Sequence, residues 1–428
     1  MQPSLGYRLD LSLFTELRND ESWSFRGLTQ KDTNYLTHCY HRYPAKFIPQ
    51  LARRVIEENT SIDDVVLDPF CGSGSAVLEG LLSGRVAYGS DINPLAYLIT
   101  KAKTTPINPS VLEKSIEYLF SSLKYYLKAS TDNLPKGIHS WFPERVIPEL
   151  NTILRAIDFD NNDVKTFFLC AFSQILKACS YWSMYSIKPY REPDKFAKTE
   201  PKPIEIFRRH VLKMQTRNEE LYNILLDIEG FNSRKSIEIS DAKRLPIKDK
   251  TISLVATSPP YVTSYEYADI HQLTLMWLGH LFPSEQIRRI FIGSMSRKET
   301  RSELLSYMAH DVITNLSKND EGLGRSVSAY FSDMQECFKE MLRVLEPSGR
   351  IAIVIGNTKL RGVEICNAQV FVEMFVNMGL SLKKVISREV PSKYLPSTRD
   401  PATGKFVSAR SLNKILAYPH EYILVFET

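Results

Sequence analysis

One four-residue stretch, Ser258-Pro259-Pro260-Tyr261, combines a hydroxyl, a backbone poor in donors and an aromatic ring. It follows the apolar residues 252–257, which predict a buried strand of a parallel sheet. Both prolines lack an N–H and fix φ, so the chain must leave this strand as a stiff loop at its carboxyl end, where open α/β sheets bind ligands. Such a loop can accept hydrogen bonds from an amino group and stack on a flat base. The alternative is a Pro-Pro turn with a surface tyrosine.

A second set of residues suits a nucleoside. The apolar residues 65–67 lead into a glycine-rich turn at 68–74 (DPFCGSG), and the strand expected at 85–89 ends beside Asp91. A strand, a glycine-rich turn, a helix and a second strand ending in an acid form a nucleoside-binding unit, in which Asp91 can accept hydrogen bonds from ribose hydroxyls. The GxG spacing is shorter than GxGxxG, which favours a ligand without phosphates. A plain βαβ crossover with a tight turn is the alternative.

Two further segments are candidates for the same pocket. Residues 38–49 (HCYHRYPAKFIP) place aromatic rings around prolines just before a helix expected from Pro49, and they either wall a small-molecule pocket or pack on the core. Asp241 follows the strand expected at 236–240. This carboxylate either meets an adenine amino group or opens a surface turn.

The elements that must position these residues form two halves of one sheet. The residues at 111–127, 143–157, 164–179 and 204–228 have helical spacing. We therefore expect a cofactor-binding half at 1–106, an inserted helical subdomain at 107–235, and a catalytic half at 236–428 that contains a second insertion at about 262–328. The strands expected at 382–386 and 422–426 suggest an antiparallel pair at the edge of the sheet.

The connection at 181–203 is both aromatic and basic. Cations can bind phosphates while rings stack on bases, so this connection is a candidate nucleic-acid contact. The alternative is a solvated loop whose aromatic side chains are tucked into the helical layer.

Composition is that of an ordinary globular protein: 428 residues, 43% of them hydrophobic and 24% charged. The net charge of +5 suits a polyanionic partner without requiring one. Six cysteines without a CxxC pair and eight histidines without metal-ligand spacing predict neither a disulfide framework nor a metal site. The absence of a signal-peptide core or a long apolar run predicts a cytoplasmic protein without a membrane span.

Together, the DPFCGSG and SPPY motifs resemble those of the amino-group DNA methyltransferases that act on N4 of cytosine or N6 of adenine. The resemblance implies a Rossmann-like α/β fold with a seven-stranded mixed sheet and S-adenosylmethionine as cofactor. It also implies double-stranded DNA as partner and a restriction-modification system, with a cognate restriction endonuclease as a candidate partner. The serine of the tetrad resembles the N4-cytosine branch. An adenine or RNA amino-methyltransferase is the alternative enzyme, and a catalytically silent nucleic-acid-binding protein on this fold is the alternative of another class.

The resemblance assigns roles by position. The catalytic candidates are Ser258, Pro259, Pro260 and Tyr261. The cofactor-binding candidates are Tyr43, Pro44, Lys46, Phe47, Asp68, Pro69, Phe70, Gly72, Ser73, Gly74, Asp91, Ile92, Asp241 and Ala242. Independently of the resemblance, the aromatic and basic connection at 181–203 and the polar loop at 391–420 provide the nucleic-acid-binding candidates, which are Lys188, Tyr190, Arg191, Lys195 and Arg399.

The expected chemistry uses hydrogen bonding and positioning. An exocyclic amino group is a poor nucleophile because its lone pair is delocalised into the ring. The Ser258 hydroxyl and the Pro259 carbonyl would accept its two N–H groups and localise that pair, while Tyr261 would stack on a base flipped out of the duplex. No cysteine lies in a Pro-Cys context, which argues against methylation at carbon 5 of cytosine.

Overall fold

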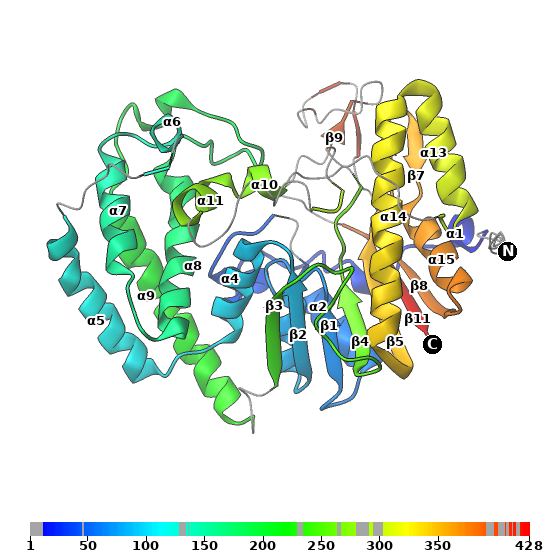
Figure 1. The fold of residues 1–428 in the computed structure, drawn as a ribbon, viewed down its shortest axis with the longest axis horizontal. Coiled ribbons are helices and arrows are strands. Elements are labelled where there is room, and N and C mark those ends of the chain that lie inside the picture. Colours follow the sequence, from blue (N-terminus) through cyan, green and yellow to red (C-terminus); the bar gives the residue numbers. More distant parts are fainter. Residues whose placement is uncertain are drawn as a thin grey trace.

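Figure 1 shows the computed structural model of the chain as a ribbon. The structure describes residues 12–44, 47–127, 134–135, 137–228, 234–262, 267–279, 291–293, 303–390, 398–400, 407, 411–412, 414–416 and 420–428. In these residues no helix combines the length and the apolar character that crossing a membrane requires.

A seven-stranded sheet forms the centre of the fold, in the order β3-β2-β1-β4-β5-β11-β8. All neighbouring strands from β3 to β5 are parallel, whereas β11 is antiparallel to both β5 and β8. The predicted mixed α/β sheet of the methyltransferase fold is confirmed. The strands are β1 (Val65–Asp68), β2 (Val86–Asp91), β3 (Lys235–Ile239), β4 (Ile252–Thr257), β5 (Leu345–Ile355), β8 (Ser381–Glu389) and β11 (His420–Glu427).

Helices cover both faces of this sheet. On one face, α2 (Pro49–Asn59) packs its apolar side on β1, β4, β5 and β11. On the other face, α14 (Glu321–Val344) and α15 (Asn367–Asn377) bury aromatic and aliphatic side chains against the same strands. The central strands are apolar on both sides because neither face meets water. α3 (Ser75–Leu82) connects β1 to β2, and α4 (Pro94–Thr104) follows β2.

The residues between α4 and β3 are mainly helical, as their spacing predicted, and lie on the left in Figure 1. They share one apolar core with α4 and α11. Asparagine followed by proline starts both α4 and α5, where Asn93 and Asn108 accept backbone N–H groups. The two ends of this segment meet, since Lys235 Nζ donates to the Thr104 carbonyl at 2.6 Å. The helices are α5 (Pro109–Tyr126), α6 (Ile138–Trp141), α7 (Val146–Ala156), α8 (Asn162–Cys179) and α9 (Pro203–Leu226).

The strand arrangement near the carboxyl terminus refines one expectation. The segments predicted as a pair at 382–386 and 422–426 do pair, but only β8 is an edge strand, because β11 inserts between β5 and β8. The remaining described α-helices and strands are short or belong to the second insertion and the terminal loops. They are α1 (Leu13–Glu16), α10 (Tyr267–Ile270), α11 (Gln272–Leu278), α13 (Tyr307–Asn319), β6 (Thr358–Leu360), β7 (Val363–Ile365), β9 (Thr398–Arg399) and β10 (Ile415–Leu416).

Candidate active site

A cavity that is open to solvent lies at the carboxyl ends of β1, β2, β3 and β4. Parallel strands end at the same edge of the sheet, which is why motifs far apart in the sequence meet there. The candidates from the sequence that line it are Tyr43, Phe47, Asp68, Pro69, Phe70, Gly72, Ser73, Asp91, Ile92, Asp241, Ala242, Ser258 and Pro260. Four candidates lie next to lining residues in the sequence but are not part of the lining: Pro44, Gly74, Pro259 and Tyr261. Lys46 lies outside the described residues.

The glycine-rich turn after β1 has a backbone that requires its glycines. Gly72 and Gly74 have φ of +50° and +71°. A Cβ on Gly74 would lie 2.7 Å from the Thr100 side chain, and one on Gly72 would lie 3.2 Å from the Tyr43 ring. Thr100 and Lys103 of α4 hold the turn by donating to the carbonyls of Gly72 and Ser73 at 3.2 and 2.9 Å.

Asp91, at the end of β2, faces the cavity with its carboxylate already fixed. Its two oxygens accept the backbone N–H groups of Gly72 at 2.9 Å and Asn93 at 2.8 Å. Burial raises the pKa of Asp91 to about 6, although the backbone hydrogen bonds oppose this rise. Each carboxylate oxygen has a second lone pair, so Asp91 can still accept a ligand hydroxyl.

Asp68 links the two halves of the sheet. Its Oδ1 accepts the Thr257 hydroxyl at 2.6 Å and the Phe70 N–H at 3.1 Å. Burial is the largest influence on this carboxyl and raises its pKa to about 7. The end of β1 is thereby tied to the last residue of β4, directly before Ser258.

The tetrad loop is supported from two sides. The hydroxyl of Tyr330, a buried residue of α14, donates to the Pro260 carbonyl at 2.9 Å. The Tyr261 hydroxyl donates to Glu421 Oε1 at 3.1 Å. Ser258 and Pro260 line the cavity, whereas the half-buried Tyr261 is not part of its lining.

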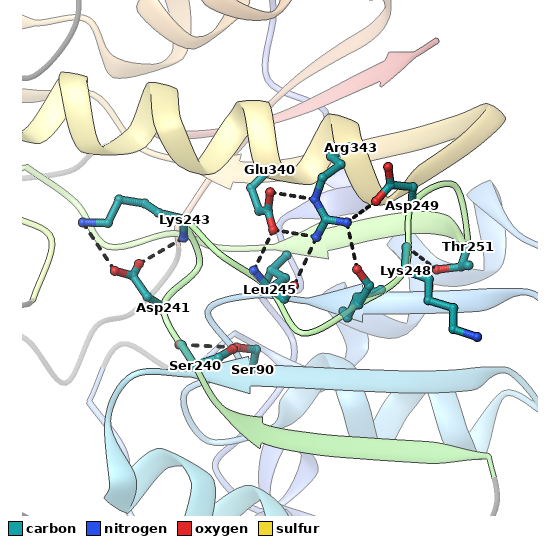
Figure 2. A network of polar contacts seen from close by, with 11 residues as sticks. Ser90, Ser240, Asp241, Lys243, Leu245, Lys248, Asp249, Thr251, Glu340 and Arg343 are labelled. Atoms are coloured by element: carbon teal, nitrogen blue, oxygen red, sulfur yellow. Dashed lines mark hydrogen bonds and ion pairs between the residues drawn. The ribbon is translucent and has the colours of Figure 1, made fainter.

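Asp241 also lines the cavity, and Figure 2 shows how its loop is held. Its carboxylate accepts the backbone N–H of Lys243 at 3.0 Å and pairs with the Lys243 ammonium at 3.5 Å. That ammonium also donates to Asp333 of α14 at 3.2 Å. Further along, Arg343 donates to Glu340 and to the carbonyls of Leu245 and Ile247. The β3–β4 loop is therefore clamped onto α14.

One nucleic-acid candidate needs correction. The Lys195 ammonium donates to three carbonyls, those of Lys177, Ser180 and Trp182, at 2.9, 2.6 and 2.7 Å. All three of its protons are used in holding the end of α8 and the following loop, so Lys195 is a structural residue and not a phosphate ligand. Burial lowers its pKa to about 8.

The same loop presents other side chains to solvent. Lys188, Tyr190 and Arg191 are exposed, and Tyr185 is 98% exposed. Trp182, by contrast, is buried, so the loop both packs on the helical layer and displays rings. Arg399 lies in β9, and its side chain is outside the description.

Several cavity residues carried no distinct signal in the sequence. Cys71, Ser75 and Asn93 sit inside or beside the motifs, whereas Phe291 and Ile292 come from the second insertion. Asn93 contacts His271 of that insertion at 2.9 Å, and burial lowers the pKa of this histidine to about 3. In the described part of the chain, no group of three or more His, Cys, Asp or Glu residues could hold a metal ion.

Comparison with known proteins agrees with this geometry. A family model described as a DNA methylase (N6_N4_Mtase) matches residues 15–102 and 252–428. The chain is 31% identical over 414 residues to the Type II methyltransferase M.MvaI of Kocuria varians, covering 90% of each chain. It is 26% identical over 396 residues to the Type II methyltransferase M.BsoBI of Geobacillus stearothermophilus, covering 78% of this chain and 76% of that relative.

The family model leaves out the whole helical insertion at 107–235 and covers both motifs, DPFCGSG and SPPY. The two motifs that carried the resemblance therefore lie within the matched residues. The chain belongs to the amino-group (N6/N4) DNA methyltransferase family, and S-adenosylmethionine is its methyl donor.

Proposed function

We propose that this enzyme methylates N4 of cytosine at a specific site in duplex DNA. The observation that carries the proposal is that Ser258 and the glycine-rich turn open into one cavity. An amino group held at Ser258 would therefore lie beside a cofactor bound along the turn. The serine in the tetrad resembles the cytosine branch of the family and so favours cytosine over adenine.

The cavity residues fit S-adenosylmethionine. Asp91 has lone pairs for the ribose hydroxyls, Ile92 offers an apolar surface for the adenine, and Asp241 offers an acceptor for its amino group. The Tyr43 ring packs beside Gly72, and both residues line the cavity, so together they would form part of the wall of the cofactor site. Asp68 and Phe70 would line the methionine moiety. The bound cofactor would supply an electrophilic methyl group.

The tetrad would prepare the target amino group. The Ser258 hydroxyl and the Pro259 carbonyl would each accept one of its N–H groups, which directs the nitrogen lone pair toward the methyl donor. Tyr330 occupies the carbonyl of Pro260, the neighbouring residue, and thereby fixes the loop geometry. Tyr261 would stack on the flipped base. Positioning and preorganised hydrogen bonds would supply the rate enhancement.

We assign DNA contact and candidate target recognition to the helical insertion at 107–235. Exposed Lys188 and Arg191 suit phosphates, while exposed Tyr185 and Tyr190 suit bases or sugars. Arg399, in β9, remains a further candidate for DNA contact. A cytoplasmic location and a role beside a cognate restriction endonuclease complete the proposal.

The test uses the full-length enzyme with labelled S-adenosylmethionine and unmodified phage DNA. Ser258→Ala and Tyr261→Ala should abolish methyl transfer while cofactor affinity, measured by calorimetry, stays close to that of the wild type. Ser236→Ala, in the edge strand β3, is the control and should transfer normally. Digestion of the product should yield N4-methylcytosine. N6-methyladenine would refute the base assignment, and full activity of Ser258→Ala would refute the role of the tetrad.

A further inference from the structure

We propose that Glu421 is a positioning residue for Tyr261 and that the buried guanidinium of Arg388 fixes Glu421. This inference rests on the proposed role of the tetrad. It adds a pair of residues, one from each of the last two strands of the sheet, that set where the stacking ring lies.

Glu421 reaches the tetrad from the start of β11. Its Oε1 accepts the Tyr261 hydroxyl at 3.1 Å, across 160 positions of sequence. The ring of Tyr261 lies close to Gly356, the residue directly after β5, where an added Cβ would come within 3.2 Å of Cε2. Gly356 therefore leaves room for the ring beside it, and Glu421 fixes the position of the ring's hydroxyl end.

Arg388 gives Glu421 a fixed charge partner. The two residues are opposite one another in the β8–β11 register, and Arg388 Nη1 lies 3.7 Å from Glu421 Oε2. The Arg388 side chain is fully buried, beside the face of Phe25. Within the part of the chain that the structure describes, none of its three guanidinium nitrogens has a hydrogen-bond partner.

A buried guanidinium with so few partners needs a nearby carboxylate, because an uncompensated buried charge is strongly destabilising. Glu421 is that carboxylate, and its attraction to Arg388 restrains its other oxygen at the Tyr261 hydroxyl. The two oxygens of Glu421 therefore make different contacts: Oε2 lies near the Arg388 guanidinium, and Oε1 accepts the Tyr261 hydroxyl.

The position of the Tyr261 ring would determine how the flipped base lies in the site. The ring of Tyr261 defines the plane on which the base stacks, and that plane decides whether the amino group reaches Ser258. Misplacement of a reacting group by about 1 Å can cost on the order of a hundredfold in rate. Loss of the hydroxyl contact should therefore lower kcat and leave cofactor binding unchanged.

The test is a double-mutant cycle on the full-length enzyme, with labelled S-adenosylmethionine and unmodified phage DNA. Tyr261→Phe and Glu421→Leu should each lower kcat roughly tenfold, which corresponds to one hydrogen bond to a charged group. The double variant should be no slower than the slower single variant, because both remove the same contact. Glu421→Gln keeps an acceptor oxygen and should recover much of the activity of Glu421→Leu.

Glu427→Gln is the matched control. Glu427 lies on the same strand and pairs with Arg350 and Lys383, both at 3.0 Å, at the end of β11 away from the tetrad. Its replacement should leave kcat unchanged. If Glu421→Leu does not fold, as judged by thermal unfolding, the cycle of Glu421→Gln with Tyr261→Phe decides, since the glutamine should have no effect once the hydroxyl is gone.

The outcomes separate this inference from the proposed function. Full activity of Tyr261→Ala would refute the role of the tetrad itself. An inactive Tyr261→Ala combined with wild-type kcat in Glu421→Leu would refute only the positioning role. The same holds if the effects of Tyr261→Phe and Glu421→Leu multiply in the double variant, or if Glu427→Gln lowers kcat as much as the Glu421 variants.

Discussion

Replacing Gly74 with alanine should damage the cofactor site by a calculable amount. The residue has φ of +71°, a left-handed conformation that costs an L-residue about 1–2 kcal/mol. The new Cβ would also lie 2.7 Å from both Oγ1 and Cγ2 of Thr100, which is fully buried. Moving Thr100 breaks its hydrogen bond to the Gly72 carbonyl, a further loss of about 0.5–1.5 kcal/mol. The backbone cost and the lost hydrogen bond together amount to about 1.5–3.5 kcal/mol.

Two further variants isolate the steric part of this cost. Gly84 lies just beyond the other end of α3 with φ of +75°, and a Cβ there meets Ile62 at an ordinary 3.6 Å. Gly84→Ala should therefore lose only the backbone cost, about 1–2 kcal/mol, with unchanged cofactor affinity. Gly74→Ala combined with Thr100→Ala removes the clash and should recover part of the loss caused by Gly74→Ala.

Urea unfolding gives the free energy of unfolding, and calorimetry gives the affinity for S-adenosylmethionine. Gly74→Ala should weaken cofactor binding at least tenfold, because the turn that lines the cavity must shift. Equal destabilisation of Gly74→Ala and Gly84→Ala, with normal cofactor affinity in both, would refute the reasoning.

Two other predictions concern the titration of Asp91 and the loop after α8, which we propose contacts DNA. Because the pKa of Asp91 is raised to about 6, its carboxylate gains a proton as pH falls through that value and loses acceptor capacity, so cofactor affinity should fall there. Calorimetry from pH 5 to 8 should show this decline in the wild type and a flatter profile in Asp91→Asn; a flat wild-type profile would contradict it. Lys195→Met should raise the KM for DNA, by roughly three- to tenfold if the lost contacts count as about one net hydrogen bond, because the loop after α8 loses its anchor. Methyl-transfer kinetics should show a smaller effect for the exposed neighbour Lys198→Met, and equal effects would argue against the anchoring role.

The parts of the site that could be predicted were those encoded by short segments next to buried strands. Asp68, Asp91 and Ser258 each follow an apolar run, and parallel strands bring such ends together without further information. The helical insertion was equally visible, because four segments with helical spacing separate β2 from β3.

Other contacts depended on packing between distant elements. Phe291 reaches the cavity from an insertion without a periodic pattern, and Glu421 and Tyr330 reach the tetrad from elements far along the chain. Lys195 was misinterpreted because a cation among aromatic residues suggests a phosphate contact. Lys195 instead binds carbonyls near the end of α8 that have no partner within the helix. Nothing in the sequence marks these carbonyls as its partners.

The contact between Thr104 and Lys235 at the two ends of the helical insertion bears on how the protein folds. Thr257 and Asp68, which join the halves of the active site, are 189 positions apart, and closing so long a loop of unfolded chain is entropically costly. The intervening helices are short-range structures that form quickly and bring their own ends together. Once they have formed, β1 and β4 are separated by a compact body instead of a loose chain. The segment that we assign to target recognition would then also help the ends of β1 and β4 to meet during folding.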